Sequence, residues 1–71
     1  MDRVQVESRS ISSIGYEVRS ETLEIEFKHG GVYQYFGVPA RDYEELMSAP
    51  SKGSGFHEVI RARDYPFSRV K

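Results

Sequence analysis

The sequence contains no cysteine, and none of its apolar stretches approaches the roughly 20 residues that a membrane-spanning helix requires. Without cysteine there can be no disulfide framework, no thiolate zinc site and no thiol nucleophile. A secreted domain of this size usually depends on disulfides, and the residues after Met1 lack the apolar core of a signal peptide. We therefore expect a cytoplasmic protein that makes no contact with a membrane.

Histidine is also scarce, since His29 and His57 are the only two. His29 is expected in a solvated turn, and His57 on the helix surface, where it could at most touch an anionic ligand. Neither has partners at metal-ligand spacing, and residues 51–55 lack the spacing of a phosphate-binding loop. Glu24 and Glu26 fit an exposed polar strand face better than an acid/base pair. We expect no enzyme activity, no catalytic centre, no metal site and no cofactor.

The chain has 71 residues, enough for a single domain spanning residues 1–71 with a small core and little room for a deep pocket. Its net charge of −1 is unevenly distributed. Residues 1–51 carry five Lys or Arg and nine Asp or Glu, whereas residues 52–71 carry five and two. A basic C-terminal part can mark a surface for nucleic acid or for an acidic partner, but this excess is small.

Hydrophobic periodicity predicts a small α+β fold. The alternating patterns give an antiparallel meander of about three strands, at residues 11–18, 22–28 and 32–37. Two short helices follow at residues 39–48 and 52–63, the first ending before Pro50. Weak patterns allow further short strands at both ends of the chain. The helices are expected to cover one face of the sheet.

The register of the hairpin around His29-Gly30-Gly31 decides where two tyrosines point. A two-residue turn pairs Phe27 with Val32 and leaves Tyr33 and Tyr35 on the face away from the core. A three-residue turn with a bulge shifts the pairing by one and places both tyrosines on the core face. We prefer the two-residue turn, because it keeps the large apolar side chains together, but the spacing does not decide between the two registers.

Each predicted helix has an apolar side with a spacing of three and four residues. In the first helix, Asp42 and the neighbouring glutamates are expected on the opposite side, away from the core. Ser51 or Ser54 can cap the second helix. The side chains expected to pack on the sheet are Tyr43, Leu46, Met47, Phe56, Val59 and Ile60.

Aromatic and basic residues form the one constellation that suggests a ligand. Tyr33 and Tyr35 share a strand face, as stacking residues do in sheet-based RNA-binding domains. C-terminal cations could contact phosphates if they fold beside that face. The alternative is that both tyrosines are half-buried packing residues, which the spacing alone favours.

Short motifs along nearly the whole chain, from about Val4 to Val70, resemble those of a known family. They are Ser10-Ile11, Ile14-Gly15-Tyr16, Leu23 to Phe27, Tyr33-Gln34-Tyr35, Val38-Pro39, Tyr43, Leu46, Ser51-Lys52-Gly53, Phe56, Ile60-Arg61 and Tyr65 to Val70. Together they are similar to the KTSC domain, a short bacterial module found alone or at the C-terminus of some lysyl-tRNA synthetases. Gly55 and His57 depart from the family pattern, in which an aromatic residue and asparagine are expected.

The resemblance implies a stand-alone binding module, with RNA suggested by the association with a tRNA synthetase. The alternative is a protein-interaction module that uses a strand edge or an apolar helix face. We expect a monomer in either case. The predicted nucleic-acid-binding residues are Tyr33, Tyr35, Lys52, His57, Arg61, Arg63 and Arg69.

Overall fold

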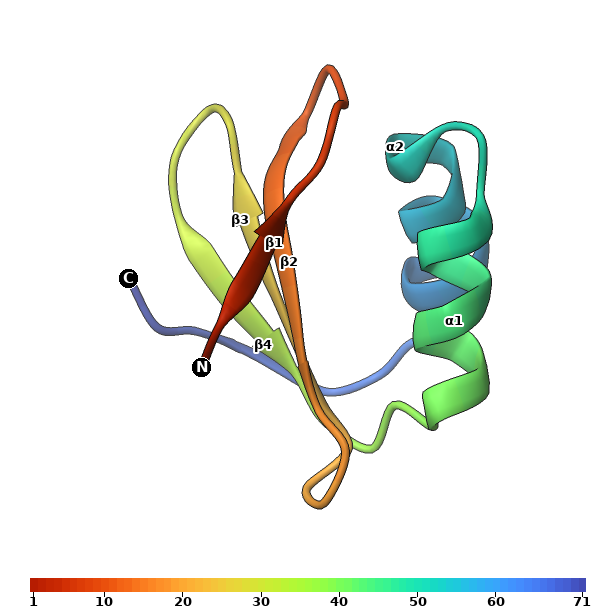
Figure 1. Cartoon of the computed structure of the whole chain (residues 1–71). Helices are drawn as coiled ribbons and strands as arrows, with labels where there is room; N and C mark the ends of the chain where they lie inside the picture. Colours follow the sequence, from red (N-terminus) through yellow and green to blue (C-terminus); the bar gives the residue numbers. More distant parts are fainter.

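A computed structural model describes all 71 residues and shows two layers, a sheet and a helical segment that covers one of its faces (Figure 1). The five strands are antiparallel and lie side by side in chain order. They are β1 (Arg3–Gln5), β2 (Ile11–Glu17), β3 (Thr22–Phe27), β4 (Val32–Tyr35) and β5 (Phe67–Arg69). This confirms the predicted α+β meander, and both terminal strands are formed.

The helical layer consists of α1 (Ala40–Ser48), α2 (Lys52–Gly55) and η1 (Phe56–Arg61), a π-helical continuation of α2. Ser51 is the N-cap of α2, and its side chain accepts a hydrogen bond from the backbone N–H of Ser54 at 3.3 Å. None of these helices has the length and hydrophobicity needed to cross a bilayer.

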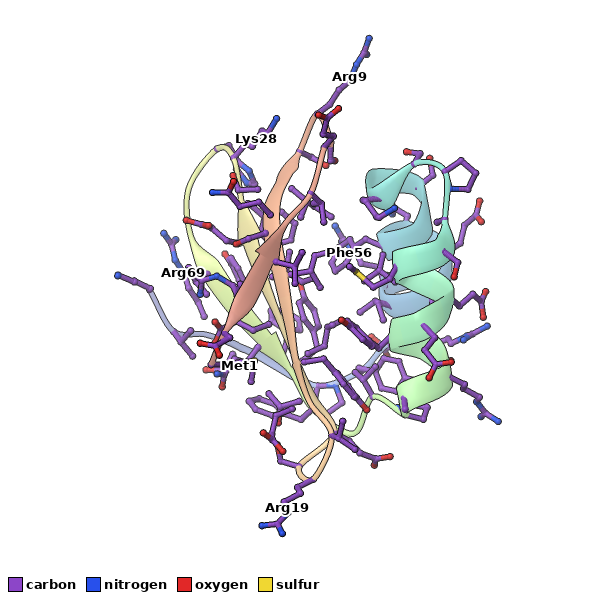
Figure 2. All side chains as sticks on the ribbon, viewed as in Figure 1. Met1, Arg9, Arg19, Lys28, Phe56 and Arg69 are labelled. Atoms are coloured by element: carbon purple, nitrogen blue, oxygen red, sulfur yellow. The ribbon has the colours of Figure 1, made fainter.

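The core lies between the two layers and contains the apolar faces predicted for both helices. Phe56 extends from the helical layer into this space, as Figure 2 shows. The buried apolar residues that form this core are Ile11, Ile14, Leu23, Ile25, Tyr35, Val38, Leu46, Phe56, Val59 and Ile60.

The preferred hairpin register is wrong, and the three-residue alternative is correct. Ile25 pairs with Tyr33 and Leu23 with Tyr35, so both tyrosines lie on the helix-covered face. The turn consists of Lys28, His29 and Gly30, and Phe27 is hydrogen-bonded to Gly31 instead of lying opposite Val32. This shift by one residue moves every side chain of β4 to the face opposite the predicted one. This register places Tyr33 and Tyr35 between the sheet and the helices, where both side chains line the groove described below.

The face of the sheet away from the helices is only partly exposed, contrary to the prediction. Glu24 is 6% and Thr22 is 8% exposed. The Arg3 guanidinium lies 2.5 Å from the Glu24 carboxylate, and the Gln34 amide donates to the same carboxylate at 2.8 Å. Gly15 leaves the space for this crossing, since a Cβ there would lie 2.6 Å from the carbonyl oxygen of Asp2. The N-terminal strand therefore covers the carboxylate of Glu24, which the alternation of polar and apolar residues predicted to be exposed to solvent.

Asp42 is also buried, at 1% exposure, although it was predicted on the outer side of its helix. Its carboxylate accepts hydrogen bonds from the Arg63 guanidinium, at 2.6 Å, and from the Tyr65 hydroxyl. The chain after η1 folds back over the start of α1 and supplies both donors. Asp42 thus joins the first helix to the segment that leads into β5.

Candidate nucleic-acid interface

A groove with a volume of about 390 Å³ lies between η1 and the flank of the sheet formed by β4 and β5. Most of its lining is aromatic, and its polar lining residues come from the end of η1 and from the β3–β4 turn. The lining residues are Phe27, His29, Tyr33, Tyr35, Phe56, Ile60, Arg61, Asp64, Tyr65 and Phe67.

Five of the aromatic rings of the groove form one continuous cluster. Tyr35 lies with its ring centroid 5.4 Å from that of Phe56 and 5.5 Å from that of Phe67. Tyr33 lies 6.1 Å from Phe67 and 5.6 Å from Phe27. These separations are typical of edge-to-face and tilted aromatic pairs, which fix the rings relative to one another.

The rings differ strongly in accessibility, and this assigns them different roles. Tyr35 is 8% exposed and Phe56 is 5% exposed, so both form the floor of the groove. Tyr33 is half-buried, whereas Phe67 is 62% exposed and forms an open wall. Phe67 is therefore the ring most open to a planar ligand, and the partly accessible ring of Tyr33 lies next to it.

Burial raises the pKa of Tyr35, although the charge of nearby Arg61 acts in the opposite direction. Burial also raises the pKa of Tyr65, and its hydrogen bond to the Asp42 carboxylate adds to this effect. Both phenols are consequently neutral at any pH near 7. The floor of the groove carries no charge of its own.

Three charged residues accompany the rings. Arg61 and Asp64 are exposed residues of the lining, and neither side chain forms an ion pair or a hydrogen bond. The Arg69 guanidinium carbon lies 5.8 Å from the centroid of Tyr33, at cation–π distance. The Arg69 Nε donates to the carbonyl oxygen of Lys71 at 3.0 Å, which leaves its two terminal nitrogens, together with Arg61, available to an anionic ligand at the groove.

The structure brings four of the seven predicted residues together, namely Tyr33, Tyr35, Arg61 and Arg69. Arg63 is held by Asp42, whose hydrogen bond and charge raise the pKa of the guanidinium.

Lys52 and His57 lie in a different hollow, about 580 Å³ in volume and without hydrophobic lining. The Lys52 ammonium donates to the carbonyl oxygen of Ala49 at 2.7 Å. Gly55 is close by, and a Cβ there would come within 2.7 Å of the Ala49 Cβ, so this chain has no room for the expected aromatic residue. The predicted cationic residues therefore do not all lie beside the tyrosines but are divided between separate places.

Several residues of the groove were not predicted as site residues, above all Phe67, Phe27 and Asp64. The short run from Phe67 to Arg69 is compatible with a strand, and a short strand at this end of the chain was allowed by the sequence. The pairing of β5 with β4 joins residues more than 30 positions apart, and local patterns do not report such contacts. No group of three or more His, Asp or Glu side chains is arranged to hold a metal ion.

The profile of the KTSC domain matches residues 7–65. The chain belongs to the KTSC domain family. It resembles an uncharacterised protein of Stutzerimonas stutzeri, with 36% identity over 70 residues and 99% coverage of both chains. The crystal structure of a KTSC domain protein from Yersinia pestis has a TM-score of 0.93 and 41% identity, covering 99% of this chain and 97% of that one.

A longer relative is the lysine–tRNA ligase of Nostoc punctiforme, which is 44% identical over 57 residues. The match covers 80% of this chain but only 10% of the ligase. The lysine–tRNA ligase of Trichormus variabilis matches over the same length at 46% identity. The KTSC domain thus occurs both as most of a short chain and as a small part of a ligase.

Proposed function

We propose that this KTSC domain binds single-stranded RNA by stacking bases against the open wall of the aromatic groove. The observation that supports this most strongly is the exposure of Phe67, at 62%, directly beside the half-buried ring of Tyr33. Aromatic rings that are both fixed by neighbours and open to solvent suit unpaired bases, each of which offers a flat face.

The charges around the groove support the same proposal. Arg61 and Arg69 can each meet a phosphate of a strand whose bases stack on Phe67 and Tyr33. The revised roles differ from those predicted, because Tyr35 supports the floor instead of stacking on the ligand. Lysine–tRNA ligases act on an RNA, and the presence of a related segment in them favours an RNA ligand here. The cysteine-free composition favours a cytoplasmic setting.

A second candidate is the addition of a peptide strand to the sheet. β5 is an edge strand of three exposed residues, so the outward backbone groups of Phe67 and Arg69 have no strand beside them. A peptide could extend the sheet there and place an apolar side chain in the groove. Binding of that kind would depend little on salt, whereas phosphate contacts weaken as salt rises.

Fluorescence anisotropy with short labelled RNAs tests the proposal. Phe67→Ala should lose about 1–3 kcal/mol of binding free energy, because one stacking surface is removed. Val18→Ala is the matched control, since Val18 is 69% exposed on the surface and is not part of the groove lining. Phe67→Tyr keeps the ring and should bind as the wild type does.

Arginine variants complete the test. Arg61→Ala should weaken all RNA sequences alike, while Arg19→Ala, at the tip of the β2–β3 turn (Figure 2), should have no effect. Absence of binding at low salt, by protein shown to be folded, would reject the proposal and favour strand addition.

A further inference from the structure

Asp64 is an unusual residue to find in a groove that receives a polyanion. It is exposed, it lies on the groove lining beside Arg61, and no cation or hydrogen-bond donor engages its carboxylate. A carboxylate repels phosphates, so a surface that only held an RNA backbone would be better without it. Its presence calls for a ligand group that donates hydrogen bonds.

The fold holds Asp64 in a defined place. Its φ angle of 57° is in the left-handed region, which aspartate tolerates better than most residues. The residues on either side, Arg63 and Tyr65, both donate to the buried carboxylate of Asp42. Their side chains are anchored in the same place, so the backbone between them has little freedom. Asp64 is therefore presented at the groove on a rigid support.

The bases differ in what they can offer a carboxylate. Guanine has an N1–H and an N2 amino group side by side, a pair of donors that matches the two oxygens of a carboxylate. Uracil offers only its N3–H on that edge, and adenine and cytosine each offer one amino group. A base stacked on Phe67 or Tyr33 would have its hydrogen-bonding edge free, because stacking uses only the ring face.

We propose that Asp64 makes the aromatic groove selective for guanine by accepting hydrogen bonds from its N1–H and N2 amino groups. This inference rests on the proposed RNA binding by the groove and adds the base that the groove selects. A paired contact of this kind discriminates against the wrong base by about tenfold or more. Asp64 is thus a specificity-determining residue, whereas Arg61 contributes affinity without preference for a base.

The test measures the binding of labelled pentaribonucleotides, UUGUU, UUAUU, UUCUU, UUUUU and UUIUU, where I is inosine. The wild-type protein should bind UUGUU about tenfold or more tightly than UUUUU. Inosine lacks the N2 amino group and should fall between the two. Asp64→Asn should bind all five alike, and it keeps a side chain that suits the positive φ angle.

Glu44→Gln is the matched control, because it removes one exposed, unpaired carboxylate from the surface of α1 outside the groove. It should leave the order of the five ligands unchanged. Equal binding of all five RNAs by the wild type, or an unchanged guanine preference in Asp64→Asn, would overturn the assignment of Asp64 while leaving RNA binding intact. Absence of binding to every RNA would overturn both proposals.

Discussion

Glu24 is an almost fully buried carboxylate on β3, the central strand of the sheet. Its carboxylate is 6% exposed and accepts hydrogen bonds from Arg3 and Gln34. Burial by itself would raise the pKa of this carboxyl group, but the hydrogen bonds from Gln34 and Arg3 outweigh it and lower the pKa below its ordinary value of 4.5. The folded protein therefore holds Glu24 ionised more strongly than the unfolded chain does.

The consequence is a dependence of stability on pH. Because the folded-state pKa is lowered, the unfolded chain binds more protons, so the free energy of unfolding falls as pH drops from about 5 through that pKa. Glu24→Gln should cost about 1–3 kcal/mol at pH 7, since it leaves Arg3 without its carboxylate. Urea unfolding at several pH values measures both effects. Between neutral pH and about pH 3, the free energy of unfolding should fall less steeply in Glu24→Gln than in the wild type.

Glu26→Gln is the control for this prediction, because the side chain of Glu26 is 42% exposed and its guanidinium partner lies 3.9 Å away. The Ser13 hydroxyl, which donates to the Glu26 carboxylate at 2.8 Å, can donate to the amide oxygen of glutamine instead. Glu26→Gln should change the free energy of unfolding by roughly 0.5 kcal/mol or less, and this free energy should fall with pH as it does in the wild type. If the free energy of unfolding fell equally with pH in the wild type and in Glu24→Gln, protonation of Glu24 would not be the cause of the lost stability.

At the scale of elements, the β3–β4 turn links the fold to the groove. Gly30 and Gly31 have φ angles of 119° and 94°, a region that side chains rarely adopt. The turn is closed by backbone hydrogen bonds from Gly30 to Phe27 and from Phe27 to Gly31, both at 3.1 Å. A Cβ on Gly31 would lie 3.1 Å from the ring of Tyr33 and 3.3 Å from the guanidinium of Arg69, whereas a Cβ on Gly30 would meet no atom within 4 Å.

The two glycines should therefore respond differently to valine. Gly30→Val should cost at least about 1 kcal/mol of unfolding free energy through backbone strain and leave RNA binding by the folded protein unchanged. Gly31→Val should carry a similar strain and also weaken binding, because it displaces Tyr33 and Arg69. Chemical denaturation and anisotropy on both variants would measure this, and equal loss of binding in the two would show that the turn does not position the groove.

The β3–β4 hairpin also shows how far local patterns reach. Alternation from Thr22 to Lys28 correctly predicted the strand and its apolar side. Two adjacent glycines, however, allow the turn to close at either of two positions, and nothing nearby in the sequence decides between them. The burial of Glu24 and of Asp42 depends on Arg3 and Arg63, each 21 residues away. Contacts between residues so far apart in the sequence cannot be predicted from the local periodicity of apolar residues.

At the scale of the whole molecule, the positive charge is dispersed. The C-terminal cations were expected to contact phosphates if they folded beside the tyrosines, but Lys52 lies in the polar hollow and Arg63 is bound to Asp42. Only Arg61 and Arg69 accompany the aromatic groove. The sequence thus predicted the family and indicated two of the aromatic residues that line the groove, Tyr33 and Tyr35. The other aromatic residues and the positions of the cations depend on how the helical segment and β5 pack.

This arrangement predicts a weak dependence of RNA affinity on salt. With two phosphate contacts, the plot of log K against log salt concentration should have a slope of roughly −1.4 for a single strand. Anisotropy titrations at four or five salt concentrations measure the slope. A slope of about −3 or steeper would mean that cations outside the groove take part, and a slope near zero would mean that no phosphate is bound.

The central claim, that the aromatic groove is the RNA-binding surface, is tested most directly by an amide NMR titration with a short single-stranded RNA. Chemical-shift changes should concentrate at Tyr33, Arg61, Asp64 and Phe67 and leave Glu24 on the opposite face unaffected. Changes centred on the face of Glu24 or on the hollow around Lys52, with the groove unperturbed, would contradict the account.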